Sequence, residues 1–247
     1  MTTLPNGPVV LEACVASVAD SVAAAQSGAQ RLELNVGIEL GGLTPSVGLL
    51  ELVKDAVEVP VLVMLRPRAG GFCYSASEKR LLIRDAELLI EHGADGLVTG
   101  GLSTEGLIDR EFIETVRDVC SEGELVFHRA FDLIQEPSQA IEELVELRVD
   151  RILTSGGETT ALEGATRISE LLCVADGRIV VLPGGGIRST TVDGLLEKTG
   201  CTQVHGTFKT LRIDPAGHVC GGDFPVVDAE EIRNVREILD RFHSGSL

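Results

Sequence analysis

The segment RIVVLPGGGIR, residues 178–188, joins a strand-like run of apolar, mostly branched residues to a turn made of one proline and three glycines. A short apolar run that ends at such residues is typical of a buried strand. The glycines leave the backbone bare where the strand ends, because no side chain covers the peptide groups. The segment therefore predicts a buried strand and suggests a function for the exposed backbone after it.

The pattern of a strand followed by a helix repeats along the chain. Strand-like runs occupy residues 9–15, 31–36, 61–67, 96–101, 124–130, 151–157, 178–186 and 202–208. Helix-like stretches lie between them, for example at residues 17–29, 77–94, 109–120, 136–147 and 189–200, and several begin after Ser or Asp and end at Gly. Strict alternation over eight units predicts an α/β fold, a single (β/α)8 TIM barrel.

No linker or block of charge interrupts this alternation, so the sequence predicts one domain, residues 1–247, with a barrel core of about 9–208. The C-terminal part, residues 209–247, departs from the pattern. Residues 210–228 are rich in Gly and Pro and predict a loop or a small hairpin, and residues 228–242 predict a closing helix.

Composition argues against two classes of partner. Lys and Arg number 21 against 38 Asp and Glu, which gives the 247-residue chain a net charge of −17. This charge repels nucleic acid and anionic membranes, and the absence of Trp with only one Tyr removes the usual platforms for stacking bases. No apolar run reaches the ~18 residues of a membrane helix, and the N-terminus lacks a secretory signal, so we expect a cytoplasmic protein. The expected assembly is a homodimer.

Strand periodicity predicts which side chains point into the barrel, since alternate residues face its interior and active sites gather at the C-terminal strand ends. The inward positions are Glu12, Cys14, Glu33, Asn35, Met64 and Arg66, with His128 and His205 at the ends of two later strands. We therefore predict a catalytic site of Glu12, Glu33, Arg66, His128 and Asp132, because burying charge is costly in a fold that needs only stability. The alternative is an internal ion network of Glu12, Glu33 and Arg66 that only stabilises the barrel.

Glycine turns after the sixth and seventh strands predict a site for an oxyanion. Backbone N–H groups that no Cβ shields bind phosphate, and late loops of barrels commonly do so. The predicted anion-binding residues are Ser155, Gly156, Gly157, Gly184, Gly185, Gly186 and Arg68. The alternative is that both segments are tight turns without a ligand.

The motif FHRAFD, residues 127–132, admits two interpretations. Either His128 or Asp132 faces a ligand, or Arg129 pairs with Asp132 and only ties down the loop. A glycine-containing loop with Arg68, Phe72 and Tyr74 is suited to a mobile cover over the mouth.

Nine segments, in order and spacing, resemble the CutC family of copper homeostasis proteins over residues 9–208. They are LEACV, RLEL, GGLTPSVGLL, VMLRPRAGGFCYS, GADGLVTGGL, FHRAFD, RILTSGG, ALEG and RIVVLPGGGI. The resemblance implies a cytoplasmic, oligomeric TIM barrel that binds copper and takes part in copper handling. It implies no established reaction.

Copper binding can be considered residue by residue. Cu(I) prefers thiolate and thioether ligands, which makes Cys14 the predicted copper ligand. The neighbouring inward position, a cysteine in some relatives, is Asn35 here, so Met64 or Cys73 would have to supply a second sulfur. None of the six cysteines forms a C-x-x-C pair, and the remaining candidate, His218 with Cys220 in the C-terminal tail, lacks a third partner.

Two functions follow from the sequence. The resemblance favours a copper homeostasis protein that binds copper directly. The alternative is an isomerase, epimerase or lyase that acts on a small phosphorylated or carboxylated metabolite, with a Glu or His moving a proton and Arg66 stabilising an oxyanion.

Overall fold

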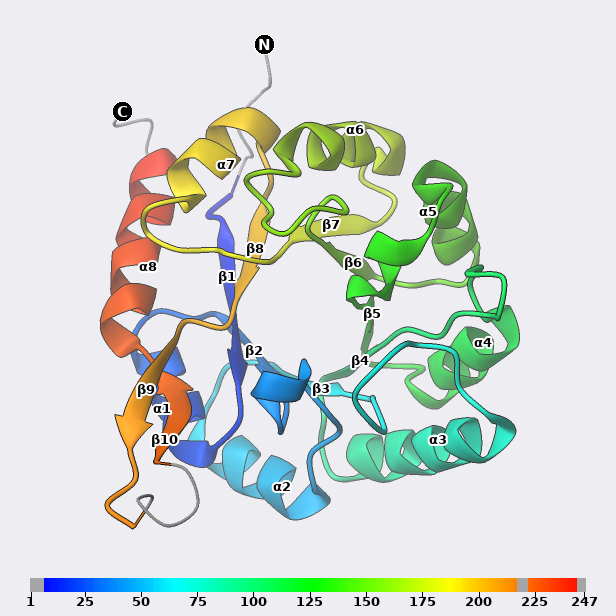
Figure 1. The fold of residues 1–247 in the computed structure, drawn as a ribbon, viewed down its shortest axis with the longest axis horizontal. Helices are drawn as coiled ribbons and strands as arrows, with labels where there is room; N and C mark the ends of the chain where they lie inside the picture. Colours follow the sequence, from blue (N-terminus) through cyan, green and yellow to red (C-terminus); the bar gives the residue numbers. More distant parts are fainter. Residues whose placement is uncertain (1–6, 217–221, 244–247) are drawn as a thin grey trace.

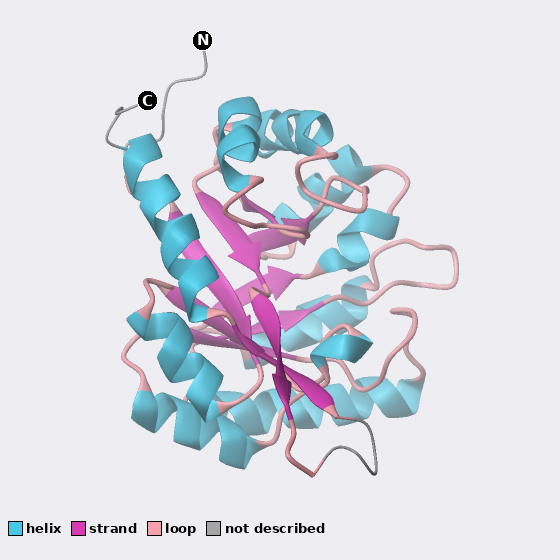
Figure 2. Cartoon of the chain, turned by 60° about the vertical axis from the view of Figure 1, so that its left-hand side comes forward, coloured by secondary structure: helices cyan, strands magenta, loops and turns pink. Residues whose placement is uncertain are grey.

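The computed structural model describes residues 7–216 and 222–243, and these form the predicted TIM barrel (Figures 1 and 2). Its parallel strands are β1 Val10–Val15, β2 Arg31–Leu34, β3 Val61–Met64, β4 Gly96–Thr99, β5 Glu124–Phe127, β6 Arg151–Thr154, β7 Val180–Pro183 and β8 Gln203–Gly206. Neighbouring strands pair in the order β7-β6-β5-β4-β3-β2-β1-β8. A parallel bridge between Gly184 and His205 joins the two ends of this sheet and closes the barrel.

Helices surround the strands on the outside (Figure 1). They are α1 Val18–Gln26, α2 Val47–Ala56, α3 Ala76–Glu91, α4 Arg110–Val119, α5 Pro137–Glu146, α6 Ala165–Ala175, α7 Val192–Thr199 and α8 Ala229–His243. The side chains of Ser17, Ser46, Ser75 and Asp109 accept hydrogen bonds from N–H groups in the first turns of α1 to α4, which explains where these helices begin. Within the described ranges, no helix is long and apolar enough to cross a membrane.

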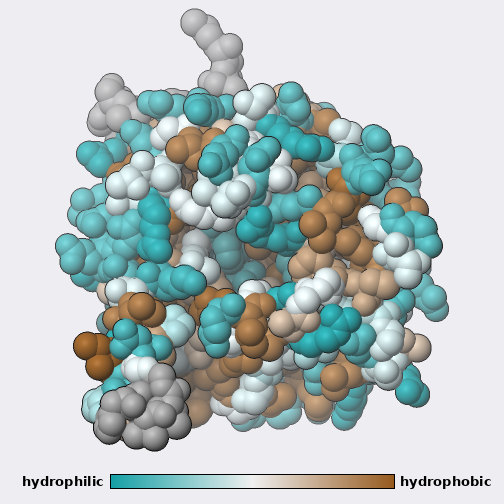
Figure 3. All heavy atoms as spheres, in the orientation of Figure 1, coloured by the Kyte–Doolittle hydropathy of each residue, from teal (hydrophilic) through white to brown (hydrophobic). Residues whose placement is uncertain are grey.

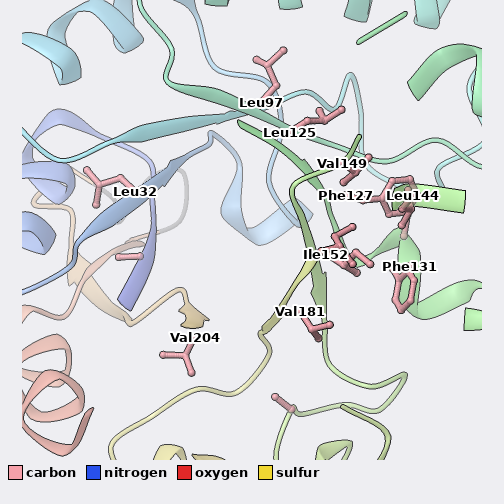
Figure 4. Close-up of a cluster of buried hydrophobic side chains, with 14 of the residues drawn as sticks. Leu32, Leu97, Leu125, Phe127, Phe131, Leu144, Val149, Ile152, Val181 and Val204 are labelled. Atoms are coloured by element: carbon pink, nitrogen blue, oxygen red, sulfur yellow. The ribbon is translucent and has the colours of Figure 1, made fainter. Parts of the chain in front are cut away.

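The alternation of side chains along each strand divides the core into two clusters. The outer cluster lies between strands and helices and includes Leu32, Leu125, Ile152 and Val204 (Figure 4). The inner cluster fills part of the barrel and consists of Leu62, Met64, Val98, Val126, Leu153 and Leu182. The predicted direction of the strand residues is confirmed, because the apolar residues of β1 to β3 expected to face the helices all belong to the outer cluster.

A polar layer lies at the start of the strands, at the end of the barrel opposite the mouth. Arg31 and Arg151 are buried and both donate to Gln203 Oε1, over 2.7 and 2.9 Å. Arg151 also pairs with Glu124. These residues begin β2, β6, β8 and β5, so one chain of hydrogen bonds ties four strands together.

The C-terminal segment contains the small hairpin that the sequence allowed. β9 Lys209–Ile213 and β10 Asp223–Val227 are antiparallel, and α8 follows them. Leu211 and Ile213 are exposed on this hairpin. His218 and Cys220, the remaining metal candidate, lie outside the described residues.

Candidate functional site at the mouth of the barrel

A cavity of about 230 Å3 lies where the strands end. The space-filling view shows a recess near the centre of this face, inside the ring of helices (Figure 3). The titratable and charged residues in its wall are Cys14, Glu33, Arg66, His128, Arg129, Arg188 and His205. Of the five predicted catalytic residues, three therefore line one cavity, whereas Glu12 reaches it through His205 and Asp132 lies elsewhere.

Glu12 is the centre of a buried ion network. Its register places it beside Arg31 on β2 and His205 on β8, and its carboxylate accepts hydrogen bonds from both side chains. The bond from His205 Nδ1 measures 2.6 Å. Burial alone would raise the pKa of Glu12, but the His205 hydrogen bond and the Arg31 charge lower it to about 2. The cation that neutralises Glu12 is thus Arg31, rather than the predicted Arg66.

Glu33 is buried next to this network but has no guanidinium of its own. Its Oε1 accepts a 2.9 Å hydrogen bond from Asn35 Nδ2, and its Oε2 has no partner among the described residues. Burial raises the pKa of Glu33, and the charge on His205 opposes that effect. One ligand atom each from Glu12, Glu33 and His205 lie within 4.8 Å of one another, close enough to hold one cation.

Cys14 faces the same cavity, and Asn35 connects it to Glu33. Asn35 Nδ2 lies 3.3 Å from Cys14 Sγ and also donates to Glu33. Burial, together with the charges of Glu33 and Glu12, raises the pKa of the Cys14 thiol well above its usual value. The thiol is therefore protonated at pH 7. Met64 also lines the cavity, whereas Cys73 is exposed and outside it.

Arg66 binds backbone oxygens rather than a carboxylate. Its guanidinium donates to the carbonyls of Leu40, Gly42 and Gly70, at 3.0, 3.2 and 2.7 Å. It thereby connects the loops that follow β2 and β3. The Phe72 ring lies 5.0 Å from its Cζ, and Arg66 Nε has no partner within the described chain.

His128 is a neutral donor at the end of β5. Its Nδ1 accepts the N–H of Ala130 over 3.2 Å. Burial and the nearby charge of Arg66 lower the pKa of His128 to about 3. The ring is thus neutral at pH 7 and carries its proton on Nε2, which has no partner in the part of the chain that the structure describes.

The turn after β6 is occupied by a carboxylate from the chain itself. Asp132 accepts hydrogen bonds from the N–H groups of Ser155 and Gly157, at 3.1 and 3.3 Å, and from the side chains of Ser155 and Thr154. Arg129 pairs with the same carboxylate over 2.8 Å. The geometry thus contains the Arg129–Asp132 pair of the loop-tying interpretation of FHRAFD, while His128 lines the cavity, as the other interpretation expects. It places Asp132 outside the cavity, and the donors of Ser155, Gly156 and Gly157 serve Asp132 and Thr154 instead of a free site.

The turn after β7 does line the cavity, through Gly185 and Gly186. Gly184 instead continues the sheet, with its N–H bonded to Thr154. Arg68 lies outside the wall, because its guanidinium pairs with Glu78 and donates to carbonyls of its own loop. Mobility of that loop stays a prediction.

Comparison with known proteins places the barrel in a family. A model of the CutC family matches residues 9–210, a span that includes all eight barrel strands. The chain belongs to the CutC family. A CutC family protein from Treponema denticola is 40% identical over 236 residues, which cover 93% of this chain and 96% of the relative.

Two further CutC relatives carry copper homeostasis in their names. The human copper homeostasis protein cutC homolog is 44% identical over 203 residues, 82% of this chain and 74% of the human protein. The solved structure of the copper homeostasis protein CutC from Streptococcus agalactiae has a TM-score of 0.77 and 32% identity, over 81% of this chain and 98% of that one.

Several wall residues of this CutC family member were not selected from the sequence as site residues, and three of them carry a charge or an aromatic ring. Arg129 was considered only as the partner of Asp132, Arg188 follows the glycine turn, and Phe72 comes from the loop after β3. The sequence did contain a signal for Arg188, because this cationic residue lies two positions after the glycine turn that was predicted to bind an anion. The Phe72 ring packs between Arg66 and His128, and the centroids of the Phe72 and His128 rings are 4.6 Å apart. Nothing in the sequence shows this arrangement.

Proposed function

We propose that this CutC family protein serves copper homeostasis in the cytoplasm by binding a Cu(I) ion at the mouth of its barrel. The observation that carries the proposal is that Cys14, Met64 and His205 line one cavity. Thiol, thioether and imidazole are the donors that suit Cu(I). The names of the human and streptococcal relatives support copper as the cargo.

A Cu(I) ion is compatible with the charge balance of the wall. When both carboxylates are ionised, Glu12 and Glu33 carry two negative charges, and Arg31 neutralises one of them. The remaining charge is balanced by a proton on His205, whose pKa rises because the two carboxylates outweigh the effect of burial. A Cu(I) ion and the Cys14 thiolate that it binds are neutral together, so when the imidazole takes the ion its balancing proton moves to Glu33, whose pKa burial raises.

Competition for Cu(I) against a chromophoric chelator, under anaerobic reducing conditions, tests this proposal. The reference protein carries Ser at the exposed Cys73 and Cys173 and at Cys220, the metal candidate of the C-terminal segment, so that these thiols do not compete. We expect one Cu(I) per chain and a loss of affinity of at least about tenfold in Cys14→Ser, since even residues that only support a ligand change metal affinity by that much. Cys201→Ser is the matched control, because Cys201 is buried away from the cavity. Equal Cu(I) affinity in the Cys14→Ser protein would refute the site.

A further inference from the structure

We propose that the mouth of the barrel also binds a small organic anion, a phosphate ester or a carboxylate, at residues distinct from the copper donors. Three guanidinium groups line the cavity, those of Arg66, Arg129 and Arg188, against the single carboxylate of Glu33. The chain as a whole carries a net charge of −17. A wall rich in cations on so acidic a protein favours an anionic ligand.

The anionic group fits the turn after β7. Gly185 and Gly186 have φ angles of 104° and 68°, and the N–H groups of Gly186 and Ile187 have no acceptor among the described residues. The Arg129 guanidinium lies against the backbone of this turn, since a Cβ atom added to Gly185 would lie 3.5 Å from Arg129 Nη1. Successive free amides beside a cation form an oxyanion site.

Arg129 is held in place for this purpose by its other nitrogens. Its Nε pairs with Asp132, and its Nη2 donates to Ser155 Oγ over 2.7 Å. Nη1 has no partner in the described ranges. The Asp132 carboxylate thus both closes the turn after β6 and orients the guanidinium toward the turn after β7. The anion-binding role that the sequence assigned to two turns belongs to the second alone.

The ligand carries further polar groups, because four residues of the wall each have an unsatisfied polar atom. Glu33 Oε2, Asn35 Oδ1, Arg66 Nε and His128 Nε2 are buried and have no hydrogen-bond partner within the described residues. A buried polar atom without a partner costs about 1–3 kcal/mol, so four on one cavity indicate groups that a ligand satisfies. Hydroxyl or carbonyl oxygens are suited to them, and a cavity of about 230 Å3 limits the ligand to a small metabolite.

Isothermal titration calorimetry with four probes tests the proposal. The probes are inorganic phosphate, ribose 5-phosphate, pyruvate and uncharged ribose. The test variant is Arg188→Gln, whose side chain makes one long hydrogen bond, to the Lys209 carbonyl at 3.4 Å, and so has little influence on folding. Arg178→Gln is the matched control. It removes the same charge just before the start of β7, and Arg178 lies outside the cavity.

We expect an organic anion to bind at one site more tightly than inorganic phosphate, and ribose not to bind. Preference for ribose 5-phosphate or for pyruvate distinguishes a phosphate ester from a carboxylate. Arg188→Gln should weaken binding about 10- to 100-fold, the effect of losing one hydrogen bond to a charged group, and Arg178→Gln should not. Failure of all three anions to bind at millimolar concentration, or equal affinity in the Arg188→Gln protein, would overturn the proposal. Cu(I) binding does not depend on Arg188, so the two proposals fail separately.

Discussion

Replacing His128 by Asn should reduce the acid sensitivity of the fold. His128 is buried at the end of β5 with a pKa lowered from 6.5 to about 3 by burial and by the charge of Arg66. Between these two values the unfolded chain binds a proton at this residue and the folded chain does not. Unfolding is therefore favoured progressively as the pH falls below 6.5, and the penalty is absent above it.

The magnitude follows from the size of that shift. One pKa unit corresponds to about 1.4 kcal/mol, so His128 alone lowers the free energy of unfolding by about 2–3 kcal/mol between pH 6.5 and pH 4.5. Asn does not titrate, and its side-chain oxygen can accept the Ala130 N–H that His128 Nδ1 accepts now. His128→Asn should be less stable than the wild type at pH 7.5, because it loses the contact with Phe72. At pH 4.5 the difference in free energy of unfolding between the two proteins should be smaller than at pH 7.5 by this amount, about 2–3 kcal/mol.

Urea denaturation at half-unit steps from pH 7.5 to 4.5 measures this gap. Val126→Ala is the control, since Val126 is an inward residue of the same strand without a titrating group. Its curve should run parallel to that of the wild type, lower at every pH. A His128→Asn curve that is also parallel would refute the assignment of a neutral, buried imidazole.

Three other predictions concern stability and are measured by denaturation at pH 7.5. Arg31→Met should cost about 3–5 kcal/mol, because it leaves the buried Glu12 carboxylate without its cation, and adding Glu12→Gln should restore part of this. Asp132→Asn should cost about 1–3 kcal/mol through weaker hydrogen bonds from the turn after β6, while Cu(I) affinity stays unchanged. Gly186→Ala should cost about 1–3 kcal/mol, since φ at this position is 68° and the new Cβ would lie 2.8 Å from Thr160 Cγ2. Adding Thr160→Ser should relieve this contact but not the backbone strain.

The barrel and the direction of its strand residues were predictable because both follow from local periodicity. The same rule also points Arg31 inward, since it shares parity with Glu33, so the cation that neutralises Glu12 was within reach of the sequence. Apart from the Arg129–Asp132 pair, the partners of Asp132 and Arg66 were not. They depend on how the loop after β5 meets the turn after β6, and on which carbonyls the loops after β2 and β3 present. Those are contacts between loops, for which strand periodicity carries no information.

The interior of the barrel above its polar floor is divided by strand. Within the strands, the apolar inner residues come from β3 to β7, whereas the inward polar residues Glu12, Cys14, Glu33 and His205 come from the adjacent β8, β1 and β2. Arg66 and His128, which also line the cavity, follow the ends of β3 and β5. Stability alone does not explain this division, because the pair of Glu12 and Arg31 is complete without Glu33, whose buried carboxylate has no guanidinium partner and leaves Oε2 without a hydrogen bond among the described residues. The polar sector is therefore better explained by a ligand, and it contains the proposed copper donors Cys14 and His205. The cationic rim at Arg129 and Arg188 lies beyond the ends of β5 and β7, which leaves separate walls for a metal ion and an anion.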